Sequence, residues 1–211
     1  MNNLDGITFT SWNTNVSKHS YADFGIILTE QNIGLPSPKT YNVSIEGMDG
    51  SLDLSECFGE MKYENRTLKF TFESIEKITD WQAKMVGIAS FLHGQKMKIK
   101  TWSDPEFYYV GRCQIDEYNS NQMLGKIVIS CDCEPFKYKK NITVFNLTEG
   151  TNTVQNSRMT VYADLINEAE ITINSKVYSA GTHLRAIKLM SGTNTLNSSG
   201  SATLTFQEGE I

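Results

Sequence analysis

The sequence predicts an all-β protein of two domains with one covering α-helix. Short runs that alternate apolar and polar residues, separated by Gly, Asn, Ser and Pro, are typical of antiparallel strands. One stretch instead repeats its apolar residues at intervals of three and four, and the composition changes after residue 138. A chain of 211 residues is long enough for one large or two small cores. We therefore expect a β-sandwich domain over residues 1–138 and a small second β-sandwich over residues 139–211.

Alternating runs define the strands of the first domain. TYNVSIEG (40–47) and RTLKFTFE (66–73) each place their apolar residues on one side, so each is expected to bury one face. EFYYVGRCQID (106–116) and GKIVISCDC (125–133) are expected to form a hairpin. In QKMKIKTW (95–102), Lys96, Lys98 and Lys100 share a face, which is more typical of a solvated or edge-protecting face than of a binding site.

The segment around TDWQAKMVGIASFLHG predicts a helix over about residues 79–93. Its apolar residues form a stripe that fits a helix covering a sheet. A following glycine can adopt the left-handed conformation that ends a helix. The stripe consists of Ile78, Trp81, Met85, Ile88 and Leu92, and the glycine is Gly94.

The cysteines are expected to be free thiols in the core. Cys131 and Cys133 are one residue apart, which is too close for a usual zinc half-site, and neither Cys57 nor Cys113 supplies a second half. Alternation places Cys131 and Cys133 on one strand face with Ile129, where a free cysteine behaves as a small hydrophobic residue. A metal or redox role is the less favoured alternative.

The second domain is predicted to begin after Pro135, because proline cannot donate to a sheet and should end the preceding strand. NITVFNL (141–147), AEITINSKVYS (169–179) and SATLTFQE (201–208) are strand-like, with Asn174-Ser175 as a turn. A unit of about 70 residues is small for an independent core, so we expect it to lean on the first domain or on a neighbouring chain.

The charge pattern and the motifs argue against most chemical functions. A formal net charge of −5 disfavours general nucleic-acid binding. No apolar run is long enough to span a membrane, and the first residues lack a secretory signal, so cytosolic folding without membrane insertion is expected. The histidines are scattered at His19, His93 and His183, and no HExxH or GxSxG motif occurs. We expect no catalytic residues, no metal ligands and no cofactor.

The acidic stretch EGMDGSLDLSE (46–56) is the most distinctive local feature. Counted from Asp49, it lacks the glycine that a calcium loop needs at its sixth position, where Leu54 stands. It has neither the spacing nor the lysine of a phosphate loop. A solvated acidic turn between strands is the favoured interpretation, because Gly47 and Gly50 fit a bend.

The order of these features resembles the distal tail proteins of long-tailed bacteriophages. The resemblance spans most of residues 20–140 and is carried by YNVSIEGMDGSLDLSECFGEMKYENRTLKFTFE, FLHGQKMKI, SDPEFYYVGRCQID and IVISCDCEPFKY. The order in which these motifs occur is moderately specific for the family, although no single motif is. In the second domain, MSGTNTLNSSGSATLTFQ is similar to the closing hairpin of the family's C-terminal, galectin-like β-sandwich.

The resemblance implies a structural virion protein rather than an enzyme. It implies a homo-hexameric ring, a tail hub that joins the tail tube to tail-tip or receptor-binding proteins, with DNA passing through the lumen without specific binding. The protein would be assembled in the cytoplasm of the bacterial host and reside in the virion tail. The acidic stretch then becomes a candidate intersubunit contact, represented by Asp49, Asp53 and Glu56. A contractile tail or a bacteriocin particle stays open.

Two rival functions come from other classes. A carbohydrate-binding β-sandwich module that contributes to host-surface recognition would need an aromatic platform in the second domain. Since the three Trp residues lie earlier in the chain, its candidates are Phe145, Tyr162, Tyr178 and Phe206. A metal-dependent enzyme is the other rival, which stoichiometric metal in the purified protein would favour.

Overall fold

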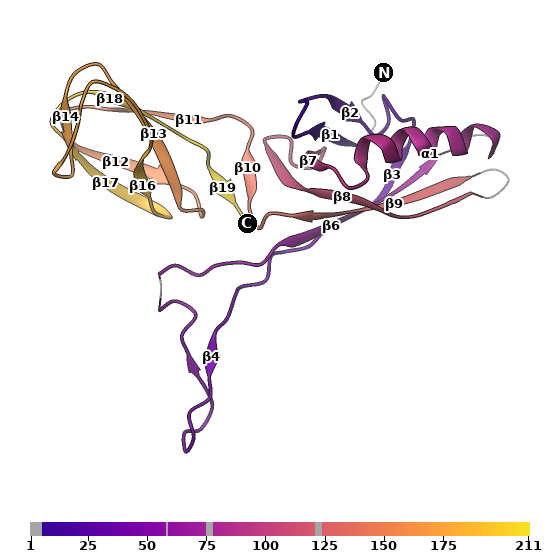
Figure 1. Ribbon diagram of the computed structural model, residues 1–211, viewed down its shortest axis with the longest axis horizontal. Helices are drawn as coiled ribbons and strands as arrows, with labels where there is room; N and C mark the ends of the chain where they lie inside the picture. Colours follow the sequence, from indigo (N-terminus) through magenta and orange to yellow (C-terminus); the bar gives the residue numbers. More distant parts are fainter. Residues whose placement is uncertain (1–5, 58, 75–77, 121–123) are drawn as a thin grey trace. The chain divides into compact units, whose positions relative to one another are not determined.

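A computed structural model describes residues 6–57, 59–74, 78–120 and 124–211. The chain divides into two compact units, one of Met1–Pro105 with Tyr109–Pro135 and one of Glu106–Tyr108 with Phe136–Ile211. Within the described residues the chain is mostly β-strand with a single helix (Figure 1), so the predicted all-β class with one covering helix is confirmed.

The first unit contains one antiparallel sheet whose strands are not arranged in sequence order. Its strands follow the order β2-β1-β7-β8-β9-β6-β3, so strands distant in sequence, such as β6 and β9, lie side by side. The predicted hairpin is the pair β8 and β9. The bounds are Ile7–Ser11 (β1), Ser17–His19 (β2), Ile27–Ile33 (β3), Arg66–Ser74 (β6), Lys96–Thr101 (β7), Phe107–Ser120 (β8) and Gly125–Cys133 (β9).

Helix α1, Ile78–Leu92, covers one face of this sheet (Figure 1). The predicted stripe is confirmed at Trp81, Met85, Ile88 and Leu92, which are all buried; the side chain of Ile78 lies outside the described residues. Gly94, with φ of 73°, ends the helix as expected. The Trp81 ring lies against Gly125, where an added Cβ would be 2.6 Å from a ring atom, so the strand can approach the ring because it has no side chain there.

The core beneath α1 is apolar and includes three thiols. In β6 the alternating residues Leu68, Phe70 and Phe72 are completely buried, as predicted for that run. Cys113, Cys131 and Cys133 are buried on the neighbouring strands, with Sγ of Cys131 2.9 Å from Sγ of Cys113. All four cysteines are free, and Cys57 is the exposed one. The expectation of core thiols is therefore confirmed for three of the four.

Residues 35–65, here called the arm, connect β3 to β6 and project beyond the sheet as a hairpin (Figure 1). Its strands are two residues each, β4 (Asn42–Val43) and β5 (Leu52–Asp53), and in the described residues they pair only with each other. The expectation that TYNVSIEG buries one face is wrong: Tyr41 is 61% and Ile45 46% exposed. The alternation is present, but no layer formed by the described residues covers it.

The second unit is a sandwich of two four-stranded sheets, ordered β11-β18-β13-β16 and β12-β17-β14-β15. Its core is a separate cluster that includes Leu165, Leu189 and Leu204. The strands are Thr143–Leu147 (β11), Gly150–Asn156 (β12), Val161–Asn167 (β13), Ile171–Ile173 (β14), Lys176–Tyr178 (β15), Gly181–Leu189 (β16), Gly192–Ser198 (β17) and Ala202–Phe206 (β18). Two further strands, β10 (Lys137–Lys139) and β19 (Gly209–Glu210), pair with each other, and β10 also pairs with Phe107 and Tyr108 of β8.

A short internal repeat organises this sandwich. GTNTV (150–154) and GTNTL (192–196) begin β12 and β17, which pair antiparallel with each other. In each copy the asparagine closes the preceding turn: Oδ1 of Asn152 accepts from the Thr148 amide at 2.9 Å, and Oδ1 of Asn194 accepts from the Met190 amide at 2.8 Å. The repeat therefore builds two equivalent turns, each of which carries the chain from one sheet of the sandwich to the other.

Candidate interaction surfaces

The acidic stretch lies at the far end of the arm and is exposed. Gly47 and Gly50 have φ of 82° and 78°, a conformation that favours glycine, so the bend expected there is present. Asp49, Asp53 and Glu56, the predicted contact residues, all lie on this arm. Because the segment between Lys39 and Lys62 contains no Lys or Arg, these carboxylates form an uncompensated negative end.

A small hydrogen-bond chain holds the two sides of the arm together. Asp53 accepts hydrogen bonds from the backbone amide and the hydroxyl of Ser55, and Oγ of Ser55 accepts from the Tyr41 amide at 2.8 Å. The Ser55 hydroxyl and then its amide hold the pKa of Asp53 below its ordinary value, because both stabilise the carboxylate.

The root of the arm is anchored by a buried arginine. Arg66, at the start of β6, is 2% exposed, and its Nε donates to the Gly34 carbonyl at 2.8 Å. Its guanidinium also donates to the Pro135 carbonyl at 3.3 Å and lies over the Tyr109 ring. The arm therefore leaves the sheet from a fixed base, although its far end has little support.

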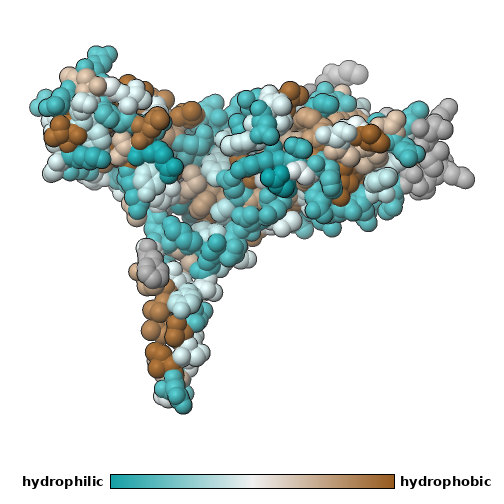
Figure 2. Space-filling model, in the orientation of Figure 1, coloured by the Kyte–Doolittle hydropathy of each residue, from teal (hydrophilic) through white to brown (hydrophobic). Residues whose placement is uncertain are grey.

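The arm exposes several large apolar side chains. Figure 2 shows hydrophobic residues gathered along it. A two-stranded hairpin is marginally stable by itself in water, and exposed apolar patches commonly mark interaction sites. The arm thus has the composition of a segment that is covered in an assembly. These side chains are Leu35, Tyr41, Ile45, Met48 and Leu52, which are between 42% and 75% exposed.

A second, partly exposed surface is here called the lysine–tryptophan face, and it consists of Trp12 with Lys96, Lys98 and Lys100 of β7. The three lysines point away from the core while Met97 and Ile99 between them are buried, so their predicted common face is present. Their Nζ atoms lie 4.7 Å (Lys96) and 5.3 Å (Lys98) from the centroid of the half-exposed Trp12 ring. Since β7 lies between β1 and β8, the lysines occupy a sheet face and not an edge.

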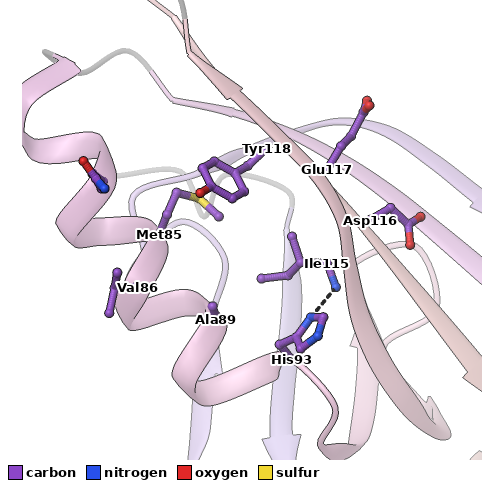
Figure 3. A pocket seen from close by; sticks show the side chains of 9 residues that line it. Met85, Val86, Ala89, His93, Ile115, Asp116, Glu117 and Tyr118 are labelled. Carbon is purple, nitrogen blue, oxygen red and sulfur yellow. Dashed lines mark hydrogen bonds between the residues drawn. The ribbon is translucent and has the colours of Figure 1, made fainter.

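A groove of about 490 Å³ runs between α1 and β8 (Figure 3). Ile115, Met85 and Tyr118 line it, while Asp116 and Glu117 point away from the helix. Nδ1 of His93 accepts a hydrogen bond from the Ile115 amide at 3.2 Å, so this histidine has a structural role: it joins the end of α1 to β8. The groove brings a histidine and two carboxylates near one another, but the carboxylates do not face the imidazole.

The second unit has a pocket of about 460 Å³ beside a β-bulge. The register between β13 and β16 shifts after Ala163, and Arg185 in the bulge has a left-handed φ of 52°. The Arg185 amide donates to Oδ1 of Asp164 at 2.7 Å, and its guanidinium lies 4.9 Å from the Tyr162 ring centroid. Of the four aromatic candidates, Phe206 and Tyr178 are buried and Phe145 is half-buried, whereas Tyr162 is 47% exposed.

The remaining sequence candidates do not assemble into a reactive centre. His19 accepts hydrogen bonds from the amides of Tyr21 and Ala22, and His183 bonds the Ser179 carbonyl, so each histidine has a separate local role. Among the described residues, no three His, Cys, Asp or Glu side chains are grouped closely enough to hold a metal ion. Nor does any helix there have the length and apolar character needed to cross a membrane.

Comparison with known proteins identifies a fold. The chain is similar to the Dit protein (gp 19.1) of phage SPP1, whose structure is described as a paradigm of the hub adsorption apparatus in phages that infect Gram-positive bacteria. The TM-score is 0.73 at 13% sequence identity, over 97% of this chain and 99% of that chain. No protein-family model and no curated protein sequence matches. The chain therefore has a Dit-like fold.

Proposed function

We propose that this protein is the distal tail protein of a tailed phage, a virion structural component that joins the tail tube to the tail-tip or receptor-binding proteins. The observation that carries the proposal is the similarity of fold to SPP1 Dit along nearly the whole of both chains. A likeness confined to one sandwich would have had little weight, because such sandwiches serve many functions. Here the sheet with its helix and the second sandwich are matched in a single chain.

The proposed assembly is a homo-hexameric ring with the tail channel at its centre. The formal net charge of −5 on each chain supports a channel through which DNA passes without specific binding, since a lumen of negative potential repels phosphates. The ring would be assembled in the host cytoplasm and carried in the virion tail. Residues 1–138 would form the ring, and residues 139–211, a proposed galectin-like domain, would lie outside it.

The arm provides the proposed contact between subunits. Its exposed apolar side chains and its marginal two-stranded pairing are consistent with a segment that becomes covered when copies meet. Asp49, Asp53 and Glu56 would then lie in or beside that contact.

The decisive experiment is negative-stain microscopy of the purified protein together with light scattering. The proposal expects particles with six-fold symmetry and a central channel, and a mass six times that of the 23.7 kDa chain. The tail-tube protein should be added in a parallel sample, because ring formation can require the tail-tube protein that adjoins the ring. A protein that stays monomeric at high concentration and with the tube protein present would contradict the hub assignment.

Carbohydrate binding is a second candidate function, favoured by the pocket at Tyr162. An exposed aromatic ring beside a guanidinium and a carboxylate supplies an apolar surface and polar groups, as small-ligand sites require. A glycan array probed with the full chain and with Tyr162→Ala tests it, using Val177→Ala, another exposed residue of the same unit, as the control. Loss of a glycan signal in Tyr162→Ala alone would support this function, and no signal from the wild-type chain would remove it.

A further inference from the structure

We propose that Cys113 of β8 and Cys131 of β9 are a redox-sensitive pair, which hydrogen peroxide converts into a cross-strand disulfide within the folded protein. Both are free thiols in the structure, and Sγ of Cys131 lies 2.9 Å from Sγ of Cys113. The site is contained in one chain. The cross-link therefore does not depend on the proposed ring, and only its timing in a virion does.

The pairing of β8 with β9 gives these cysteines the arrangement that a disulfide needs. Cys113 lies directly opposite Cys131 in the antiparallel ladder. The Cys113 amide donates to the Gln95 carbonyl at 3.0 Å, and the Cys113 carbonyl accepts from the Gly94 amide at 2.8 Å. Both backbone groups of Cys113 are thus directed away from β9, so the two cysteines are a non-hydrogen-bonded pair. In such pairs the Cα atoms are about 4.5 Å apart, which is within the range of native disulfides.

The third thiol beneath α1 is not an equivalent partner. Cys133 lies opposite Gly111, and its Sγ occupies the space that a side chain at Gly111 would need. It is the diagonal neighbour of Cys113, and diagonal neighbours are about 7 Å apart, whereas a disulfide holds its Cβ atoms about 3.5–4.5 Å apart. Cys131 and Cys133 follow each other on one strand face at about 6.6 Å. The geometry therefore selects one pair and leaves Cys133 as a thiol.

Oxidation of this pair by hydrogen peroxide needs no other reactant. The thiolate sulfur of one cysteine attacks a peroxide oxygen and the O–O bond breaks. This forms a sulfenic acid, and the departing hydroxide becomes water with the proton that the thiol lost. The sulfur of the other cysteine then displaces the hydroxyl group, which leaves as a second water with the second thiol proton. The two sulfurs lose two electrons and form one S–S bond, while the peroxide is reduced to two waters.

Burial slows this reaction but leaves a route for a small oxidant. Both thiols are completely buried, and burial raises the pKa of Cys131, so its reactive thiolate is rare at neutral pH. The groove between α1 and β8 is lined by Ile115, which lies two residues from Cys113 on the same side of the strand (Figure 3). Hydrogen peroxide is small and uncharged, so it can pass from this groove to the thiols in brief openings that exclude a maleimide.

The cross-link would fasten the two strands at the middle of the sheet, where β8 lies between β7 and β9. It joins residues 18 positions apart, and closing a segment of this length restricts the unfolded chain and so stabilises the folded one. Under the proposed function, the chain is made in a reducing cytoplasm and later meets an oxidising medium. The pair would then be dithiol during assembly and disulfide in the released particle.

Peptide mass analysis of the full-length protein tests the cross-link. Cys57→Ser is the background, because the exposed arm thiol forms links of its own. The folded protein would be treated with hydrogen peroxide at mildly alkaline pH and then alkylated in denaturant. We expect the free thiols to fall from three, the four cysteines less Cys57, to one. Trypsin cleaves after Lys126, so Cys113 and Cys131 end in different peptides, and fragmentation at Asp132 places the link.

Matched variants identify the partners. Cys133→Ala should keep the link, and Cys131→Ala should abolish it without a link from Cys113 to Cys133 in its place. Circular dichroism would verify the folding of each variant. A link to Cys133 in the chain that retains Cys131 would overturn the inference. So would sulfinic acids without any link, or three unchanged thiols after prolonged treatment.

Thermal melting tests the consequence. The oxidised protein should melt roughly 5–10 °C higher than the same sample after reduction with a phosphine. The comparison stays within one sample because peroxide also oxidises methionines, which the phosphine does not restore. Cys131→Ala should show no such difference. An oxidised form that melts at or below the temperature of the reduced form would overturn the stabilising role. All of these readouts come from the single chain, so a failure of the proposed ring leaves them unchanged, and their failure leaves the ring unchanged.

Discussion

The second unit covers its two sheets with each other, whereas the first covers one face of its sheet with α1 and leaves the end of the arm exposed. In β13 and β18 of the second unit, buried residues alternate regularly with residues on the outside. In the first unit, the same kind of alternation in TYNVSIEG leaves Tyr41 and Ile45 exposed. The difference suggests that the second unit is stabilised by its own core, while the first carries surfaces suited to assembly.

The largest expected effect is in the core of the first unit. Trp81→Ala should lower the free energy of unfolding by about 3–5 kcal/mol, because it removes a ring that is 3% exposed and lies against Gly125. Chemical denaturation followed by circular dichroism measures the change. Val86→Ala, on the exposed side of the same helix, should have an effect within about 0.5 kcal/mol. Equal losses in the two variants would mean that α1 does not cover the sheet as described.

A matched substitution in the second unit tests whether its core is independent. Leu204→Ala should cost about 2–5 kcal/mol, because Leu204 is completely buried in the second cluster. Since the two clusters share no buried residue, calorimetry should resolve which unit each substitution destabilises. Ile166→Ala, at an exposed position of β13, is the control. A single transition that shifts equally for Trp81→Ala and Leu204→Ala would contradict independent cores.

These cores are also the part of the molecule that the sequence predicts well. Alternation in RTLKFTFE and the stripe of α1 report burial against other parts of the same chain, so local pattern and final contacts agree. Alternation in TYNVSIEG is equally clear, but a pattern does not reveal whether the covering layer belongs to the same chain. The sequence does not predict the arm for this reason, because TYNVSIEG has the pattern of one more strand with a buried face.

Candidate surfaces were predictable to different degrees. The charges of the acidic stretch and the common side of Lys96, Lys98 and Lys100 follow directly from the sequence, because strand alternation fixes which residues share a side. The contact of Trp12 with these lysines depends on the pairing of β1 with β7, which lie about 90 residues apart. The Tyr162 pocket depends on a bulge at Arg185, which strand alternation does not predict. The repeated GTNTV and GTNTL are the sequence signal of the two equivalent turns that precede β12 and β17.

Thiol chemistry distinguishes the arm from the sheet. Maleimide should label Cys57 in the native protein and leave Cys113, Cys131 and Cys133 unlabelled until denaturant is added. Burial raises the pKa values of Cys131 and Cys133, so their reactive thiolate forms remain rare even when moderately alkaline pH accelerates labelling of Cys57. Peptide mass analysis gives the sites. Native labelling of the three sheet thiols at the rate of Cys57 would show that the core beneath α1 is open.

The smallest expected effect is a pH dependence confined to the arm. Hydrogen bonds from Ser55 lower the pKa of Asp53 in the folded protein, so the folded state favours the carboxylate more than the unfolded state does. Their stabilising contribution is fully present above the unfolded pKa of about 3.9 and is lost as the pH falls through the lower folded value. Because the Ser55 hydroxyl also accepts from the Tyr41 amide, protonation of Asp53 should loosen the link between the two sides of the arm.

Nuclear magnetic resonance can follow this titration at single residues. The Tyr41 and Ser55 amide signals should shift together as Asp53 is protonated, while the amide signals of Phe70 and Ile129, a buried pair in β6 and β9, stay unchanged over the same pH interval. Ser55→Ala should move the Asp53 midpoint back toward the ordinary value, since it removes the hydroxyl donor, and Asp53→Asn should abolish the transition at both amides. A midpoint that is the same in the wild type and in Ser55→Ala would mean that the hydroxyl does not set the charge state of this carboxyl. The arm would then be held by its backbone hydrogen bonds alone, and its order in the free chain would be independent of pH.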